Sequence, residues 1–246
     1  MILSDNAKKS FKVYDDDSFI VSYPRSGQTW FRSLLATVKC GKGWLTDIHV
    51  DSVIPDFRRT SRLDRKNLGK GMRIFKTHEY VNSRYKRILY LVRDPRAVAY
   101  SLWNWRCKMN PKSKWKYEGP FDIKFIEEFL AGKIFPGAWT THIEGWSEHA
   151  KNHDVSFEWL FYEDLFRRTK KFLHTSCVFL GIPWKEYLLE DAVRQFPAGK
   201  PTGFLVNSIK PLTASPNKWR EAYTEEMLNL INSELCDHLK ELGYEV

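Results

Sequence analysis

Short apolar runs alternate along the chain with longer stretches in which apolar residues recur every three or four positions. The run RILYLV at 87–92 is almost wholly apolar, as is typical of a strand that is buried on both faces. Runs of this kind predict strands at 18–23, 72–75, 87–92 and 155–162. Helical spacing predicts helices at 29–38, 95–105, 121–130, 138–152, 163–180, 184–196 and 224–242.

Strands that alternate with helices predict an α/β fold class, formed by a single domain over residues 1–246 with a central parallel sheet flanked by helices. In such sheets ligands bind beyond the carboxyl ends of the strands. The residues that directly follow the predicted strands are therefore the first candidates for a functional site. The stretch 39–71 is expected to be basic and loop-like with weak helical segments, and 197–217 is expected to be irregular.

Charge and cysteine content narrow the classes of partner. A formal net charge of +9 favours anionic ligands, although a solvated basic surface is an equal alternative because the charge is spread along the chain. The 15% aromatic content indicates a pocket lined by rings as well as a core. Four cysteines without metal-binding spacing, no apolar N-terminal signal and no membrane-spanning run predict a soluble cytoplasmic protein with reduced thiols and no membrane partner.

The first chemical motif is the sequence YPRSGQTW, from Tyr23 to Trp30, which joins the strand at 18–23 to the helix at 29–38. This strand-turn-helix unit is P-loop-like and suits phosphate binding, because backbone N–H groups at a helix N-terminus favour an anion. Arg25 adds a fixed positive charge. A plain strand-to-helix turn is the alternative. The motif is not that of a nucleotide kinase, since no Gly-Lys pair in the chain is followed by Ser or Thr.

Two further motifs follow the next two predicted strands. Lys76 and His78 end the first of them, and a histidine there is a candidate general base because its ordinary pKa lies near ~6.5. Arg93 ends the second, and Ser101 lies about two helical turns further along. Arginine suits bidentate contact with a phosphate. The alternatives are a surface histidine and an ordinary helix N-terminus with ion pairs.

Taken together, these motifs resemble those of the cytosolic-type sulfotransferase family that uses 3′-phosphoadenosine 5′-phosphosulfate (PAPS). YPRSGQTW resembles the family's YPKSGTTW loop, KTH resembles its catalytic-base motif, and RDPRAVAYS resembles its 3′-phosphate segment. PGAWTTHIEGW at 136–146 and FYEDL at 161–165 also match, so the likeness extends from residue 18 to 165. The resemblance implies transfer of a sulfuryl group from PAPS to a hydroxyl or amine of a small molecule, with 3′-phosphoadenosine 5′-phosphate (PAP) as product and no metal.

The resemblance also implies a role for each matched residue. His78 would deprotonate the acceptor, while Lys76 and Arg25 would stabilise negative charge in the transfer step. The residues implied to bind the donor are Arg25, Ser26, Gly27, Gln28, Thr29, Trp30, Arg93, Ser101 and Tyr162. The residues implied to lie toward the acceptor are His142, Trp103 and Trp139.

Three positions depart from the family pattern. Arg25 replaces a lysine, which keeps the charge but provides a group that does not release its proton. The C-terminal RKG phosphate clamp is absent, because residues 212–214 read LTA, and Lys210 or Lys218 could substitute for it. Glu79 follows the candidate base where the family often has an apolar residue, which suggests either attraction of a cationic acceptor or a side chain that points to solvent.

Other classes of function fit the residues less well. A P-loop phosphotransferase would need the Gly-Lys-Ser/Thr sequence and an acidic metal ligand after a buried strand, and the strand at 87–92 ends instead in Arg93. A nucleic-acid-binding protein would need a clustered basic face. A protein that binds PAPS without transfer would not need the Lys76 and His78 pair. The sequence leaves open the oligomeric state and the acceptor, including the choice between O- and N-sulfation.

Overall fold

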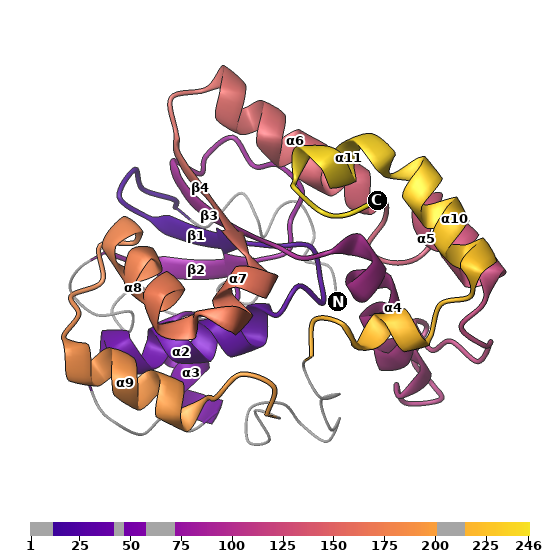
Figure 1. Cartoon of the computed structure of the whole chain (residues 1–246). Coiled ribbons are helices and arrows are strands. Elements are labelled where there is room, and N and C mark those ends of the chain that lie inside the picture. The colour runs from indigo at the N-terminus through magenta and orange to yellow at the C-terminus, as the bar shows by residue number, and fades with distance from the viewer. Residues whose placement is uncertain (1–11, 42–46, 58–71, 201–214) are drawn as a thin grey trace.

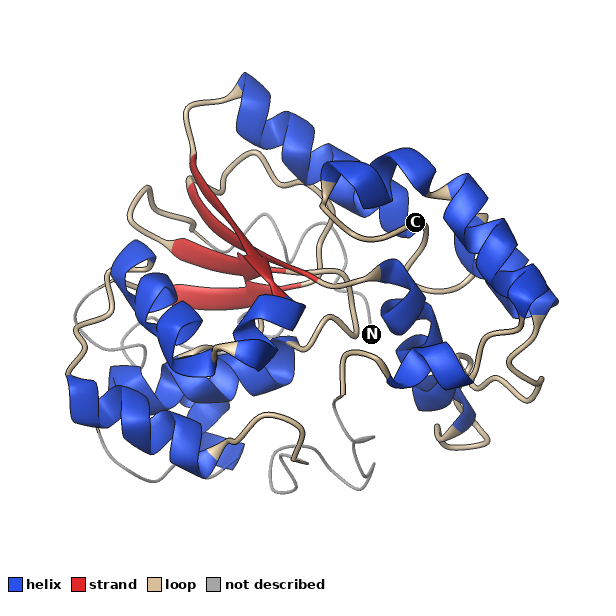
Figure 2. Cartoon of the chain, in the orientation of Figure 1, coloured by secondary structure: helices blue, strands red, loops and turns tan. Residues whose placement is uncertain are grey.

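Four parallel strands form one sheet at the centre of the molecule (Figures 1 and 2). The computed structural model describes residues 12–41, 47–57, 72–200 and 215–246. The strands lie in the order β2-β1-β3-β4, so that β1 has a neighbour on each side. Their bounds are β1 (Ser18–Val21), β2 (Ile74–Thr77), β3 (Arg87–Val92) and β4 (Ser156–Phe161).

The register of the sheet brings the carboxyl ends of all four strands to one edge. Val21, the last residue of β1, pairs with Thr77 at the end of β2 and with Tyr90 in β3. Val92 in turn pairs with Phe161 at the end of β4. The residues that follow the strands therefore gather at this edge, where ligands bind in parallel sheets.

Helices cover both faces of the sheet (Figure 1). One face carries α2, α3, α8 and α9, and the other carries α5, α6, α10 and α11, with α4 and the short η3 beside them. The bounds are α2 (Gln28–Cys40), α3 (Asp47–Val53), α4 (Pro95–Cys107), α5 (Ile123–Leu130), α6 (Trp139–Asn152), α7 (Tyr162–Arg167), α8 (Thr169–Phe179), α9 (Glu186–Gln195), η3 (Lys218–Glu221), α10 (Glu225–Glu234) and α11 (Cys236–Glu241).

Each face of the sheet packs into its own hydrophobic core. Ile88 and Tyr90 of β3 point into the core with α4, α5 and α6, whereas Leu89 and Leu91 point into the core with α2, α8 and α9. Successive strand residues point to opposite faces, so a strand that is covered on both sides must be apolar throughout. This explains the unbroken apolar run in β3, and it confirms the predicted α/β class with a central parallel sheet.

The structure corrects several predicted boundaries. The helix predicted at 163–180 is two helices, α7 and α8, separated at Arg168, whose backbone leaves the helical region (φ −134°, ψ 54°). The helix predicted at 224–242 likewise separates at Leu235 into α10 and α11. The periodicity hides both breaks, because the paired helices bury their apolar residues in the same core. Helix α3 lies in the stretch 39–71, where weak helical segments were expected, and η3 lies between the predicted irregular stretch 197–217 and the predicted helix at 224–242.

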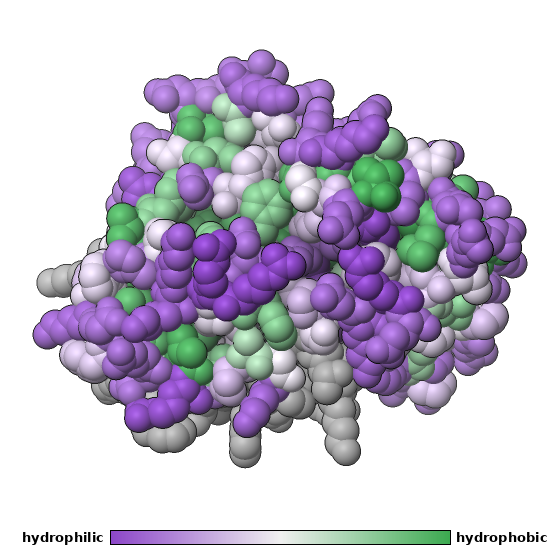
Figure 3. All heavy atoms as spheres, viewed as in Figure 1, coloured by the Kyte–Doolittle hydropathy of each residue, from purple (hydrophilic) through white to green (hydrophobic). Residues whose placement is uncertain are grey.

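The second predicted strand also lies two residues later than expected. Residues 72–75 were predicted, but β2 spans Ile74–Thr77, so Lys76 lies within the strand and His78 directly follows it. The face shown in Figure 3 is largely hydrophilic, with smaller hydrophobic patches among the hydrophilic residues. Among the described residues, no helix is long and apolar enough to cross a membrane. The domain boundary of 1–246 stays a prediction.

Candidate functional site

The loop between β1 and α2 has a backbone that leaves the start of the helix uncapped by side chains. Arg25 and Gly27 both have positive φ, at 74° and 93°. A positive φ is uncommon for a residue other than glycine and is found where the surrounding structure enforces it. Gly27 is the N-cap of α2, and the structure has no side-chain capping hydrogen bond at this helix start within the described part of the chain. These groups and the helix dipole favour a bound anion.

Two guanidinium groups meet beside this loop. The Arg25 Nε donates a hydrogen bond to the Ser101 Oγ at 3.3 Å, and the Arg93 Nη1 donates to the Arg25 carbonyl oxygen at 3.1 Å. The Arg93 guanidinium also lies over the ring of Tyr162, 4.4 Å from its centroid. Four residues that the sequence assigned to donor binding thus come together from the ends of β1, β3 and β4 and from α4.

Neither of these two arginines forms an ion pair with a carboxylate in the described part of the chain, although Glu163 lies near enough to Arg93 for their charges to interact. Burial, and then the positive charge of Arg93, lower the pKa of Arg25 to about 10. In addition, the Ser26 Oγ and the Arg93 Nε are buried without a hydrogen-bond partner among the described residues. Buried polar atoms normally have partners, so this site fits a ligand with several anionic oxygens.

The remaining loop residues are used differently. The Gln28 Nε2 donates to the carbonyl oxygens of Ile20, at 2.8 Å, and Thr77, at 3.1 Å, and so ties the end of β1 to the end of β2. The Trp30 Nε1 donates to the Phe196 carbonyl oxygen at 2.9 Å. Thr29 is exposed in the first turn of α2. The Gln28 side chain therefore has a structural task that the sequence did not reveal.

His78 is oriented by the segment that follows β1. Its Nδ1 lies 2.7 Å from the Ser22 carbonyl oxygen and 3.3 Å from the Ser22 Oγ. Because a carbonyl oxygen only accepts hydrogen bonds, the shorter contact places the hydrogen on Nδ1 and leaves the lone pair on Nε2. Sequence reasoning named His78 but missed Ser22, which becomes a neighbour of His78 only because β1 and β2 are paired.

Lys76 has an ion-pair partner that sequence reasoning also missed. Its Nζ lies 2.8 Å from the Asp56 Oδ2, and Asp56 is only 4% exposed. Asp56 lies just after α3 and forms an isolated parallel bridge with Lys76. No motif in the sequence marks it. The positive charge of Lys76 is therefore partly balanced by an ion pair within the protein, whereas Arg25 and Arg93 form no ion pair with a described residue.

His142, a histidine of α6, lies among aromatic rings on the face of the sheet that α6 covers. His142 is fully buried, and its Nδ1 is hydrogen-bonded to the Tyr90 hydroxyl at 2.7 Å. Burial lowers the pKa of His142 to about 4, so the ring is neutral at physiological pH. Its Nε2 has no hydrogen-bond partner among the described residues. The rings of Tyr23 and Tyr80 lie with their centroids 5.7 and 5.1 Å from that of His142.

The two tryptophans assigned to the acceptor side are not among the rings that contact His142. Trp139 is buried at the start of α6, and Trp103 is half-buried, with its Nε1 donating to the Gly119 carbonyl oxygen at 3.1 Å. A third tryptophan, Trp105, lies under the Arg25 guanidinium at 5.8 Å. Its spacing of four residues from Ser101, on one face of α4, is the signal that could have identified it.

The Glu79 side chain is tied to the core. Its Oε2 accepts a hydrogen bond from the Tyr85 hydroxyl at 2.6 Å, and its carbonyl oxygen accepts one from the Trp146 Nε1 at 3.1 Å. Tyr85 is fully buried and stacks on Phe19. Glu79 is half-buried, so its side chain does not simply point to solvent, and its contacts with the core are not explained by a role toward the acceptor.

Two lysines were named as possible substitutes for the phosphate clamp. Lys218 is the first residue of η3, whereas Lys210 lies outside the described residues.

Comparison with known proteins assigns the family. A model of the sulfotransferase domain matches residues 15–233, which is most of the chain. The chain therefore belongs to the sulfotransferase family.

Curated relatives and solved structures agree with this assignment. The chain is 28% identical to sulfotransferase 2A2 of rat over 187 residues, which cover 72% of this chain and 63% of that protein. It is 25% identical to the amine sulfotransferase of rabbit, over 75% of this chain and 62% of that protein. The chain thus spans less than two thirds of the length of these relatives. A crystal structure of mouse sulfotransferase SULT7A1 complexed with PAP has the same fold, with a TM-score of 0.72 and 21% identity over 95% of this chain and 87% of that one.

The loop geometry predicts that Gly27→Ala weakens anion binding. A Cβ at Gly27 would overlap the ring of Tyr162, so either the loop or the ring that supports Arg93 must move. We expect the dissociation constant for PAP, measured by calorimetry, to rise at least about tenfold, the equivalent of 1.4 kcal/mol. Gly41→Ala is the matched control, because Gly41 also has a positive φ, of 64°, but a Cβ there meets nothing within 4 Å. Binding by Gly27→Ala at wild-type strength would contradict this view of the loop.

Glu79 allows a test of the charge preference of the acceptor site. If its carboxylate attracts a cationic acceptor, Glu79→Gln should lower turnover of a cationic acceptor relative to a matched neutral one by about fivefold, as expected for an ion pair of roughly 1 kcal/mol. Glutamine can still accept the hydrogen bond from Tyr85, so the fold should be preserved. An unchanged ratio of the two turnover rates would show that Glu79 serves only the core.

Proposed function

We propose that the chain is a sulfotransferase that moves a sulfuryl group from PAPS to a hydroxyl or amine of a small-molecule acceptor. The observation that carries this proposal is the pair of guanidinium groups, Arg25 and Arg93, which form no ion pair with a described carboxylate at the sheet edge where His78 also lies. Membership of the sulfotransferase family, and a PAP-bound structure of the same fold, support the choice of donor.

In this proposal the anion site holds the two phosphorylated ends of the donor. PAPS supplies the sulfuryl group and the phosphate that leaves with the nucleotide. Arg93 and Ser101 bind the 3′-phosphate, and the loop from Arg25 to Trp30 binds the 5′ end through N–H groups at the start of α2. The unpartnered Ser26 Oγ and Arg93 Nε provide donors of hydrogen bonds there.

His78 acts as the general base. With Nδ1 donating to the Ser22 carbonyl oxygen, the lone pair on Nε2 can accept the proton of the acceptor hydroxyl or amine. The same carbonyl oxygen stabilises the imidazolium that forms, because the Nδ1–H bond becomes charge-assisted. Ser22 thus sets both the tautomer and the direction of the base.

The positive charge that stabilises the leaving group is assigned mainly to Arg25. Lys76 is paired with Asp56 at 2.8 Å, so part of its charge is already balanced, whereas among the described residues Arg25 has only a serine hydroxyl as a side-chain hydrogen-bond partner. Charge that develops during transfer is stabilised most by cations that are fixed in place and not neutralised. Arginine and lysine side chains carry this task in the proposal, which therefore needs no metal ion.

The acceptor is assigned to the side of the sheet where His142 and its aromatic neighbours lie. A neutral, buried imidazole with a free Nε2 can exchange a hydrogen bond with a hydroxyl or amine. Some relatives are named as acting on a 3-alpha-hydroxysteroid and others on amines, so both classes of acceptor are candidates for this chain. None of the four cysteines, all of which lie among the described residues, forms a disulfide, which agrees with the proposed action in the cytoplasm.

Calorimetry with PAP, ATP and ADP tests the donor, and His78→Ala tests the base. We expect micromolar binding of PAP that requires the 3′-phosphate and no Mg²⁺, and a decrease of kcat by about 10²–10⁴-fold in His78→Ala with PAP affinity kept. A preference for Mg·ATP would point to phosphoryl transfer. Binding of PAP without any turnover across an acceptor panel would point to a nucleotide-binding protein that is not an enzyme.

Substitution of Arg25 tests where the leaving-group charge is stabilised. Arg25→Lys restores the residue type of the family loop and should retain activity, whereas Arg25→Met removes the charge and should lower kcat by about 10²–10³-fold. The two substitutes have similar length, so the comparison isolates the charge. If methionine is tolerated, Lys76 must provide this stabilisation alone despite its pairing with Asp56.

A further inference from the structure

The turn that carries Arg93 is held by a carboxylate outside the motifs that bind the donor. Asp94, the next residue, caps α4, and its side chain is fully used in bonds to the Arg96 backbone N–H, at 2.9 Å, and to the Arg96 guanidinium. Its own backbone N–H points the other way and donates to the Glu163 Oε1 at 3.1 Å. Glu163 is thus the only hydrogen-bond partner of this buried N–H among the described residues.

Tyr162 and Glu163 contact both a side chain and the backbone of this turn. Tyr162 places its ring under the Arg93 guanidinium, and Glu163 binds the Asp94 N–H that directly follows Arg93. Burial raises the pKa of the Glu163 carboxyl, while hydrogen bonds and the charge of Arg93 oppose this rise. The first two residues of α7 therefore set both the side chain of Arg93 and the backbone that carries it.

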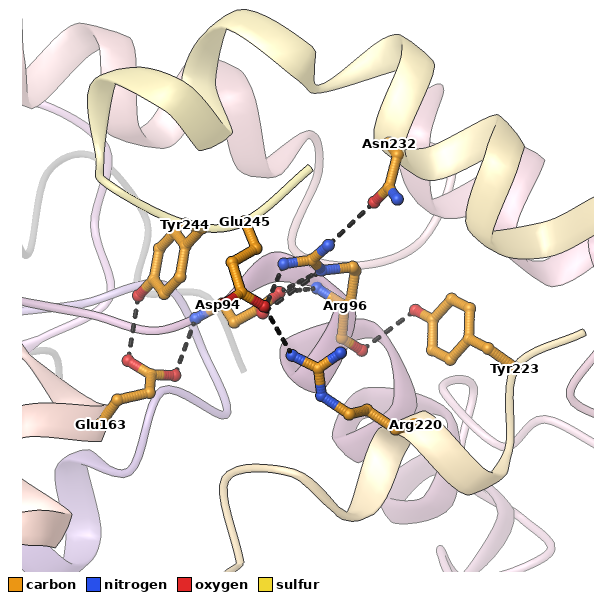
Figure 4. Close-up of polar contacts among 8 residues, drawn as sticks. All are labelled: Asp94, Arg96, Glu163, Arg220, Tyr223, Asn232, Tyr244 and Glu245. Atoms are coloured by element: carbon orange, nitrogen blue, oxygen red, sulfur yellow. Dashed lines mark hydrogen bonds and ion pairs between the residues drawn. The ribbon is translucent and has the colours of Figure 1, made fainter. Parts of the chain in front are cut away.

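The second oxygen of Glu163 is held by the last segment of the chain. The Tyr244 hydroxyl donates to the Glu163 Oε2 at 3.0 Å (Figure 4). Burial, and then the nearby charge of Glu163, raise the pKa of Tyr244 well above its usual range, so the hydroxyl stays a donor. A carboxylate with one oxygen bound on each side cannot rotate without losing a charge-assisted hydrogen bond.

The end of α11 directs Tyr244 to this place. The Gly243 N–H donates to the Lys240 carbonyl oxygen at 3.0 Å, and the Tyr244 N–H donates to the Leu239 carbonyl oxygen at 2.8 Å. This pair of bonds, with Gly243 at a φ of 73°, is the Schellman motif that turns a chain back at a helix end. The ring of Tyr244 then packs against Phe161, the last residue of β4.

We propose that Tyr244 is a positioning residue for recognition of the donor's 3′-phosphate, and that it acts through Glu163 on the turn that presents Arg93. The inference rests on the proposed function, because it takes Arg93 as the ligand of that phosphate. It assigns a task to the segment after α11, which none of the matched motifs contains. Figure 4 shows Tyr244 and Glu163 on one side of Asp94 and Arg96, with Tyr223, Asn232 and Arg220 on the other.

The test compares two ligands that differ only in the 3′-phosphate, PAP and adenosine 5′-phosphate, by calorimetry on the full chain. Tyr244→Phe removes one hydroxyl, so we expect the affinity ratio of PAP to adenosine 5′-phosphate to fall about three- to tenfold, part of the strength of a hydrogen bond to a charged group. The affinity for adenosine 5′-phosphate itself should change less than about twofold, because that ligand does not use Arg93.

Tyr223→Phe is the matched control. Its hydroxyl is also buried and donates to the same turn, to the Arg96 carbonyl oxygen at 3.0 Å, but it does not contact Glu163. We expect this variant to lose thermal stability without a change in the affinity ratio. An equal fall of the ratio in both tyrosine variants would mean that any weakening of the turn has the effect, and would overturn the assignment to Tyr244.

A double-mutant cycle tests whether Tyr244 acts through Glu163. If Tyr244 acts through Glu163, Tyr244→Phe should have no further effect on the ratio in a Glu163→Ala background, whereas additive effects would overturn the proposed route. Wild-type protein without a preference for PAP would overturn the proposed function itself. A wild-type preference that Tyr244→Phe leaves unchanged would overturn only this inference.

Hydrogen exchange on the wild-type chain gives a second test that needs no variant. Coupling between two sites is reciprocal, so a bound 3′-phosphate should stabilise the segment that positions its ligand. We expect PAP to slow exchange of the Tyr244 amide, which donates to Leu239, more than adenosine 5′-phosphate does at equal saturation. Equal protection by the two nucleotides would contradict the proposal even if Tyr244→Phe failed to fold.

Discussion

The parallel pairing of β1 with β2 and β3 is the constraint on which the candidate site depends. Because Val21 is paired with Thr77 and Tyr90, the residues that follow these strands have to share one edge. The Gln28 amide reinforces this alignment by bonding to carbonyl oxygens at the ends of both β1 and β2. A shift of one residue in this register would separate His78 from the carbonyl of Ser22 and turn neighbouring side chains to the opposite face.

The cationic side chains at this edge of the sheet differ in whether they have an ion-pair partner. Lys76 has a buried carboxylate in ion-pair contact, while Arg25 and Arg93 approach each other without an ion-pair partner in the described part of the chain. Two adjacent cations without an ion-pair partner among the described residues raise the free energy of the protein until an anion binds, because both are partly removed from water. The same property that makes this arrangement unfavourable alone favours the binding of an anion.

The site is also supported from distant parts of the chain. The Arg93 turn touches α7 through Tyr162 and Glu163, and Glu163 in turn touches Tyr244, which lies 81 residues further along. Arg96, in the first turn of α4, is bonded to Asn232 of α10. The C-terminal helices thus do more than cover the sheet, because they brace the backbone beside the anion site.

Local patterns in the sequence determined the fold class and most of the elements. Apolar runs located all four strands, since a strand covered on both faces can carry almost no polar residue. The motifs also located Arg25, His78, Arg93 and Ser101, because each lies at a strand end or on the following helix. The sequence could not determine the breaks at Arg168 and Leu235, because the apolar period continues across each break into a shared core.

Tertiary structure alone decided which partner each of these residues has. Three pairs of partners illustrate this: Ser22 with His78, Asp56 with Lys76, and Tyr244 with Glu163. Their members lie 56, 20 and 81 positions apart in the chain, and no pair shares a local motif. Such pairs arise only when strands align and helices pack, and a hydrogen bond or an ion pair depends on distances of a few ångströms that no local pattern specifies. The sequence therefore determined the chemical groups of the site, and the packing determined their tautomer, their charge balance and their support.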